Sequence, residues 1–109
     1  MTTVTIYKSD SDSYKGFTCD GHAGFAIFGK DIVCASISML VINTLNSLEV
    51  LTHESMKVNT DEKSGYIDCV FDHEISEQSK LLIDSMILGL KSIAEQYGKK
   101  YVRLKFEEV

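Results

Sequence analysis

Two side chains in the first third of the chain, His22 and Cys34, provide a nucleophile and a matching base. A cysteine thiolate attacks a carbonyl carbon, and an imidazole beside it takes the proton of the thiol and returns it to the leaving group. Twelve positions separate the two residues, and the connection between them carries Gly24 and Gly29. The pair is a candidate dyad for nucleophilic catalysis if the fold brings the imidazole and the sulfur together.

Cys34 falls where a helix is predicted to begin. Asp31 precedes Ile32 and Val33, and aspartate is a preferred N-cap because its carboxylate accepts a free backbone N–H. With Asp31 as the cap, Cys34 is the third helical residue. It then lies near the positive end of the helix dipole and near free N–H groups that can hold an oxyanion. Asp31 is either only this cap, which we favour, or a third member of the site that orients His22.

The residues around the candidate dyad add two further hypotheses. Ser38 follows Cys34 by one helical turn and is a candidate supporting residue, although a serine tolerated inside a helix explains it equally well. The connection before the helix is apolar and is predicted either to continue the sheet or to form a loop that binds and encloses a peptide substrate. The residues of this candidate substrate loop are Gly24, Phe25, Ile27, Phe28 and Gly29.

Gly21-His22-Ala23 and Asp31-Ile32-Val33-Cys34-Ala35, with Ser38 one turn on, resemble the ribosomal-processing cysteine protease family Prp over nearly the whole chain. The resemblance implies that Cys34 is the nucleophile and His22 its general base and acid. It also implies a homodimer, and a substrate that is the N-terminal extension of a large-subunit ribosomal protein, removed through an acyl-enzyme. Two alternatives are a noncatalytic ribosome-assembly module and a redox sensor in which Cys19 resolves an oxidised Cys34.

Length and composition indicate one soluble domain over residues 1–109, with 44% hydrophobic and 25% charged residues. No tract is expected to reach the ~18 apolar residues of a membrane span, and no signal peptide is recognised, so we expect a cytoplasmic protein without a membrane partner. Three cysteines without a CxxC pair predict free thiols and neither a metal nor another cofactor. The net charge of −5 disfavours nucleic acid and suits a basic peptide. Cys69 is predicted to be a core thiol, and His53 and His73 to lie on the surface.

Periodicity predicts an α+β fold of two layers, in which two helices pack on one face of a five-stranded mixed sheet in the order ββαββαβ. Met39 and Ile42 widen the apolar arc of the first helix beyond what one sheet face covers, which either dimerisation or deep burial explains. The predicted strands are Thr3–Lys8, Tyr14–Gly21, Met56–Thr60, Gly65–Phe71 and Lys100–Glu107, and the predicted helices are Ile32–Leu51 and Glu77–Tyr97.

Overall fold

The computed structural model describes residues 1–21, 30–61, 63–98 and 100–109, and it describes residues 30 and 31 by their backbone alone. Within these ranges the elements follow the predicted order ββαββαβ, and the predicted α+β architecture is confirmed. The strands are β1 (Thr2–Lys8), β2 (Tyr14–Asp20), β3 (Met56–Asp61), β4 (Tyr66–Phe71) and β5 (Val102–Glu108), and the helices are α1 (Lys30–Val50) and α2 (Glu77–Tyr97).

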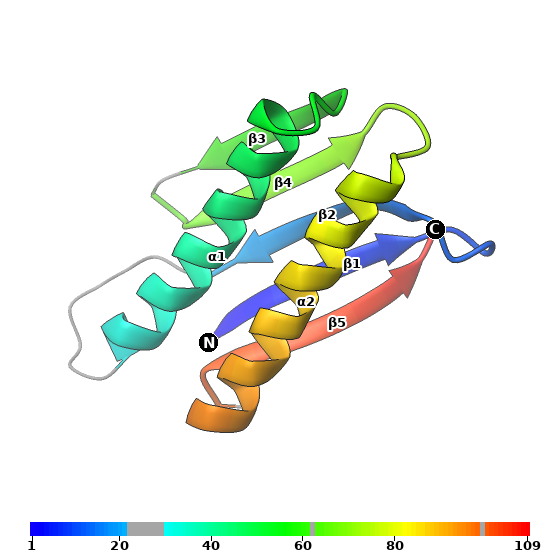
Figure 1. Cartoon of the computed structure of the whole chain (residues 1–109). Coiled ribbons are helices and arrows are strands. Elements are labelled where there is room, and N and C mark those ends of the chain that lie inside the picture. Colours follow the sequence, from blue (N-terminus) through cyan, green and yellow to red (C-terminus); the bar gives the residue numbers. More distant parts are fainter. Residues whose placement is uncertain (22–29, 62, 99) are drawn as a thin grey trace.

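The described strands form one sheet in the order β3-β4-β2-β1-β5. β1 runs parallel to β5, whereas the pairs β1–β2, β2–β4 and β3–β4 are antiparallel, so the sheet is mixed as predicted. Both helices lie side by side across the same face of the sheet (Figure 1). This arrangement leaves β3 and β5 as the two edge strands.

The hydrophobic core fills the space between the sheet and the two helices. Alternation along the strands turns one set of side chains toward the helices, and helical spacing turns the matching stripes of α1 and α2 toward the sheet. Each fully buried side chain of the size of valine, leucine or phenylalanine contributes roughly 1.5–3 kcal/mol of transfer free energy. The fully buried hydrophobic residues include Val4, Ile6, Phe17, Cys19, Val33, Ile37, Val41, Leu48, Ile83, Met86 and Leu90, all at most 1% exposed. This packing holds α1 in a fixed position over the sheet.

The first helix begins earlier than predicted. α1 starts at Lys30, two residues before the expected Ile32, so Asp31 lies inside the first turn and not at the N-cap. An acidic residue suits the first turn as well as the cap, because the positive end of the helix dipole favours it at both places. Cys34 is therefore the fifth residue of the helix instead of the third.

The last strand is only partly covered. Phe106 alternates along β5 with Val102 and Leu104, yet its side chain is 47% exposed. It is paired with Ile6 of β1, and β5 lies at the sheet edge, where no further strand shields it. The ammonium groups of Lys8 and Lys91 lie 5.5 and 6.0 Å from the centre of its ring, so two amphipathic side chains provide part of the cover.

By length and composition, the segment Ile32–Val50 is apolar enough to cross a membrane, with a mean hydropathy of 1.4. The expectation that no tract approaches a membrane span was therefore wrong on these criteria. In the fold, one side of this helix is buried in the core through Val33, Ile37, Val41, Leu45 and Leu48.

Met39 and Ile42 lie outside that buried stripe. Their side chains are 68% and 42% exposed, so the deep burial that we considered for them is wrong. The apolar arc of α1 is thus wider than the part that the sheet covers.

Candidate active site

The thiol of Cys34 lies where the start of α1 meets the start of β1. The Cys34 side chain is half-buried, and its Sγ is 3.8 Å from Oγ1 of Thr2, within hydrogen-bonding distance for sulfur. Thr2 is the first residue of β1 and is fully buried. The candidate nucleophile therefore has a fixed hydroxyl group beside it at the junction of helix and sheet.

The same hydroxyl group reaches the end of β2. Oγ1 of Thr2 donates a long hydrogen bond of 3.4 Å to the carbonyl oxygen of Gly21, the residue immediately before His22. The backbone N–H of Thr2 donates to the carbonyl of Tyr101 at 3.0 Å, which fixes the backbone at this point. With its proton on the Gly21 carbonyl, the hydroxyl oxygen can accept from the thiol, and once a thiolate forms it can turn and donate to the sulfur.

Gly21 has a physical reason to be glycine. Its φ of +90° lies in the region that residues with a side chain rarely adopt. A Cβ at this position would lie 2.6 Å from the carbonyl oxygen of Met1, which is too close for any substitution without a shift of the backbone. The chain therefore leaves β2 close against the start of β1, in a direction that only glycine permits.

The described residues test part of the predicted site. Cys34 and Gly21 are brought to one place, and Ser38 is half-buried one turn after Cys34 on the same side of α1. His22 lies outside the described residues, and so do the loop residues Gly24, Phe25, Ile27, Phe28 and Gly29. Only the backbone of Asp31 is described, so the contact between His22 and Cys34 and the orienting role of Asp31 stay predictions.

Sequence reasoning missed Thr2. The predicted first strand began one residue later, and a threonine in a strand is ordinary because β-branched residues favour strands. Its role follows from a contact between residues 32 positions apart, which no local pattern reveals. The one available signal was its place opposite the Gly21-His22 sequence, once the antiparallel pairing of the first two strands is assumed.

The other two cysteines are unsuited to nucleophilic chemistry. Burial raises the pKa of the Cys19 thiol to about 12, with smaller contributions from Asp20 and Cys34. Burial, followed by Asp68, likewise raises the pKa of the Cys69 thiol to about 12. The prediction that Cys69 is a core thiol is confirmed, since it is 1% exposed. Cys19 is a neutral, fully buried thiol, which argues against a resolving role.

The predicted surface positions of His53 and His73 are confirmed, because both side chains are exposed. Of the cysteines, all of which the structure describes, Cys34 is the one that solvent can reach. A partly exposed thiol near the start of a helix is a setting in which reactive cysteines are found.

Comparison with known proteins identifies the class. The family model described as cysteine protease Prp matches residues 1–103. A crystal structure of the ribosomal processing protease Prp from Staphylococcus aureus, in complex with a substrate peptide, superposes with a TM-score of 0.89 at 28% identity, covering 98% of this chain and 100% of that chain. A Streptococcus mutans structure superposes with a TM-score of 0.87 at 27% identity, covering 100% of this chain and 99% of that chain.

The ribosomal processing cysteine protease Prp of Bacillus subtilis is 33% identical over 101 residues, which are 89% of this chain and 90% of that protein. Its counterpart from Staphylococcus aureus is 29% identical over 107 residues, 98% of this chain and all of that protein. The fold and the half-buried thiol are thus those of a cysteine protease. The chain belongs to the Prp family, and the resemblance seen in the sequence is confirmed.

The contact between Thr2 and Cys34 predicts an effect on thiol reactivity. Thr2→Val keeps the shape of the side chain and removes the hydroxyl group. One hydrogen bond of this kind corresponds to roughly a 2- to 10-fold change, and we expect alkylation of Cys34 by iodoacetamide to slow by that factor near pH 7. Thr2→Ser should restore the wild-type rate. Thiols in general are ionised near pH 10. Comparing the rates near pH 7 with those near pH 10 therefore shows whether the substitution alters the ionisation of the thiol or the access of iodoacetamide to it. Equal rates for wild type and Thr2→Val near pH 7 would contradict the assignment.

Native alkylation should also distinguish the three thiols. A thiol reacts as its thiolate, and the pKa of Cys19 and of Cys69 is raised to about 12, so both stay protonated at ordinary pH. At about pH 8 we expect mass spectrometry to find one adduct, on Cys34, in the folded protein and three adducts in denaturant. A native adduct on Cys19 that forms as fast as the one on Cys34 would revive the redox-sensor hypothesis.

Proposed function

We propose that the protein is a cysteine endopeptidase that removes the N-terminal extension of a large-subunit ribosomal protein. Its relatives are named ribosomal processing cysteine proteases, and the Staphylococcus aureus protease has been crystallised with a substrate peptide and with a covalently linked product peptide. The observation that carries the proposal is the half-buried thiol of Cys34, held at the start of α1 beside the end of the strand that leads to His22.

The proposed reaction passes through an acyl-enzyme. His22 takes the proton of Cys34, the thiolate attacks the scissile carbonyl carbon, and the oxyanion accepts hydrogen bonds from backbone N–H groups. His22 then protonates the leaving amine, the C–N bond breaks, and a thioester to Cys34 remains. Water, deprotonated by His22, hydrolyses the thioester and regenerates the thiol.

The start of α1 supports this account of the oxyanion. The first four N–H groups of a helix have no partner within the helix. Because α1 begins at Lys30, these groups belong to the four residues just before Cys34, and we assign the oxyanion to them. The hydroxyl of Thr2 lies beside the sulfur and can donate to the thiolate before attack.

We also propose that two copies associate through the helices. Several apolar side chains on the outward faces of α1 and α2 are exposed, and both helices lie on one face of the sheet (Figure 1). The exposed fractions are 63% for Ile32 and 68% each for Met39, Leu81 and Leu88. Exposed apolar side chains on two neighbouring helices are typical of a self-complementary interface.

We place the reaction in the cytoplasm, as one catalytic domain over residues 1–109 that works without a cofactor. The cysteines are free, which suits a reducing compartment, and a ribosomal protein is made there. The net charge of −5 favours a basic peptide over nucleic acid as the partner, and the buried stripe of α1 packs against the sheet.

Incubation with the extended ribosomal protein, read by mass spectrometry, tests the activity. Wild type should cut the extension at one site. Cys34→Ser and His22→Ala should each lower kcat/KM by roughly 1000-fold or more, because the members of a catalytic dyad act as a unit. Their thermal melting should stay near that of wild type. Cys69→Ala, which removes a different thiol, should keep kcat. Cleavage by Cys34→Ser at the wild-type rate would refute the proposal.

Sedimentation tests the dimer. Met39→Glu places a charge on the outward face of α1 and should convert a dimer into a monomer at micromolar concentration, since a buried unpaired carboxylate costs several kcal/mol. The matched control is Val70→Glu on β4, whose side chain is 48% exposed on the sheet and away from the helices. A wild type that sediments as a monomer, or a dimer that survives Met39→Glu, would contradict the interface.

A further inference from the structure

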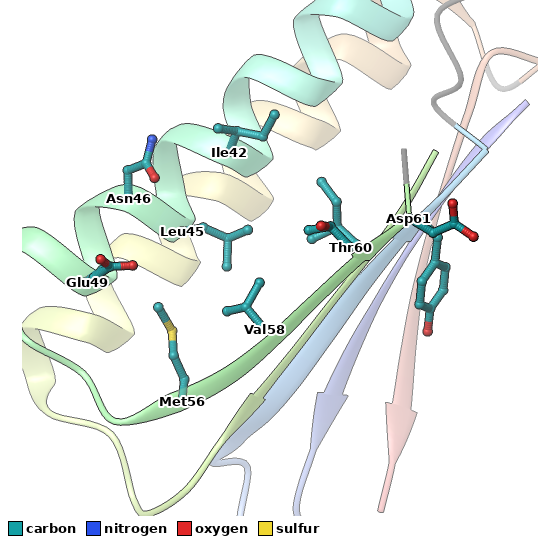
Figure 2. Close-up of a pocket in the computed structure, with 10 residues that line it drawn as sticks. Ile42, Leu45, Asn46, Glu49, Met56, Val58, Thr60 and Asp61 are labelled. Carbon is teal, nitrogen blue, oxygen red and sulfur yellow. The ribbon is translucent and has the colours of Figure 1, made fainter. Parts of the chain in front are cut away.

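A pocket of about 320 Å³ lies between the second half of α1 and the edge strand β3. Figure 2 shows Leu45 of α1 and Val58 of β3 pointing toward one another across it, with Met56 directed into the same space. Glu49, one turn after Leu45, is exposed and lies on the helix side of the pocket. The pocket thus combines apolar walls with two carboxylates, those of Glu49 and Asp61.

The strand that forms one wall of this pocket has an open edge. Within the described sheet, β3 pairs with β4 on one side only, and the side chains from Lys57 to Asp61 are all exposed. Every second residue of such a strand turns its backbone N–H and C=O groups outward. An extended peptide can pair with these groups and direct alternate side chains into a neighbouring pocket.

The pocket shares a side of α1 with the candidate nucleophile. Cys34, Ser38 and Ile42 follow one another at intervals of four residues, and Ile42 lines the pocket. Leu45 and Glu49 continue the same side of the helix by a further turn. From Cys34 to Leu45 the helix rises roughly 16 Å. An extended peptide covers this distance with about five residues.

We propose that this pocket is a substrate subsite. A segment of the peptide substrate adds to the open edge of β3 and places an apolar side chain, of the size of leucine or phenylalanine, between Leu45 and Val58, about five residues from the scissile bond. A basic residue next to that side chain faces Glu49. The inference rests on the proposed function, because it assumes that Cys34 is the nucleophile that attacks the scissile bond.

Charge and shape select a peptide as the occupant. Val58 is 41% exposed, although its neighbour on β4, Cys69, is in the core. The pocket is therefore closed on the side of β4 and open on the side of the solvent. The negative side chain of Glu49 and the net charge of −5 attract a basic, extended segment. An extended peptide can pair with the backbone groups at the open edge of β3, whereas a helix bound in the pocket would leave these groups without a partner.

A charge placed in the pocket tests the subsite. The variant is Val58→Lys and its matched control is Val70→Lys, a valine of similar exposure, 48%, on the neighbouring strand and the opposite face of the sheet. The substrates are the ribosomal extension peptide with about eight residues on each side of the cut and a truncated peptide with about three on each side.

Wild type should cut the long peptide with a KM roughly 10- to 100-fold lower than that of the truncated peptide, because one buried apolar side chain is worth that factor. Val58→Lys should lose this preference, with KM equal for both peptides and kcat little changed. Val70→Lys should keep it. A Val58→Lys enzyme that still prefers the long peptide, or a Val70→Lys enzyme that loses the preference equally, overturns the subsite.

Binding separates a failed subsite from a failed protease assignment. Fluorescence anisotropy with the labelled long peptide measures binding of the peptide to the enzyme and does not require cleavage. Binding to wild type and Val70→Lys, lost in Val58→Lys, supports the subsite even if no peptide is cut. Absence of binding to wild type overturns it. Sedimentation of Val58→Lys identifies the other occupant: a dimer lost only in this variant would show that a second copy fills the pocket, and it would overturn the proposal.

Discussion

The contacts of one buried hydroxyl group join the parts of the molecule that must meet for catalysis. Oγ1 of Thr2 lies 3.8 Å from the sulfur of Cys34 and donates to the carbonyl of Gly21 at 3.4 Å. The first contact ties β1 to α1, and the second ties β1 to the end of β2. Both helices are fixed on the sheet by a continuous core, which holds this junction in place. The glycine at position 21 is what allows the strands to approach closely enough.

The proposed active site and the proposed substrate subsite lie at different parts of one helix, α1. The start of α1 carries the thiol of Cys34 and the first backbone N–H groups of the helix, to which the proposed mechanism assigns the oxyanion. The second half of the same side of α1 forms a pocket with β3, whose open edge suits an extended chain. The outward side of α1 carries the exposed Met39, which the proposed dimer uses. A single, largely apolar helix therefore serves the core and, in our proposals, the active site, the subsite and the dimer, which would account for apolar residues beyond the buried stripe.

Local signals in the sequence were sufficient for most of the fold. The bounds of α2, Glu77–Tyr97, were predicted to the residue, because Ser76 caps its first turn and Gly98, with φ of +97°, ends it. The start of α1 was missed by two residues, since aspartate is accepted both at the cap and in the first turn. Thr2 and the pocket beside Val58 were not predicted at all. Both depend on contacts between elements far apart in the chain, which periodicity and capping do not encode. The sequence predicted that Cys34 lies near a helix start, but it did not predict the contact of Cys34 with Thr2.

The central claim is that the imidazole of His22 and the sulfur of Cys34 lie close enough to exchange a proton. Histidine-selective NMR measures this directly, with the exposed His53 and His73 as internal references. If the two groups interact, replacing Cys34 by alanine removes a thiolate neighbour, and the pH at which the His22 signal titrates should fall by about one unit while the reference signals keep their positions. A His22 titration that is the same with and without the thiol would contradict the account.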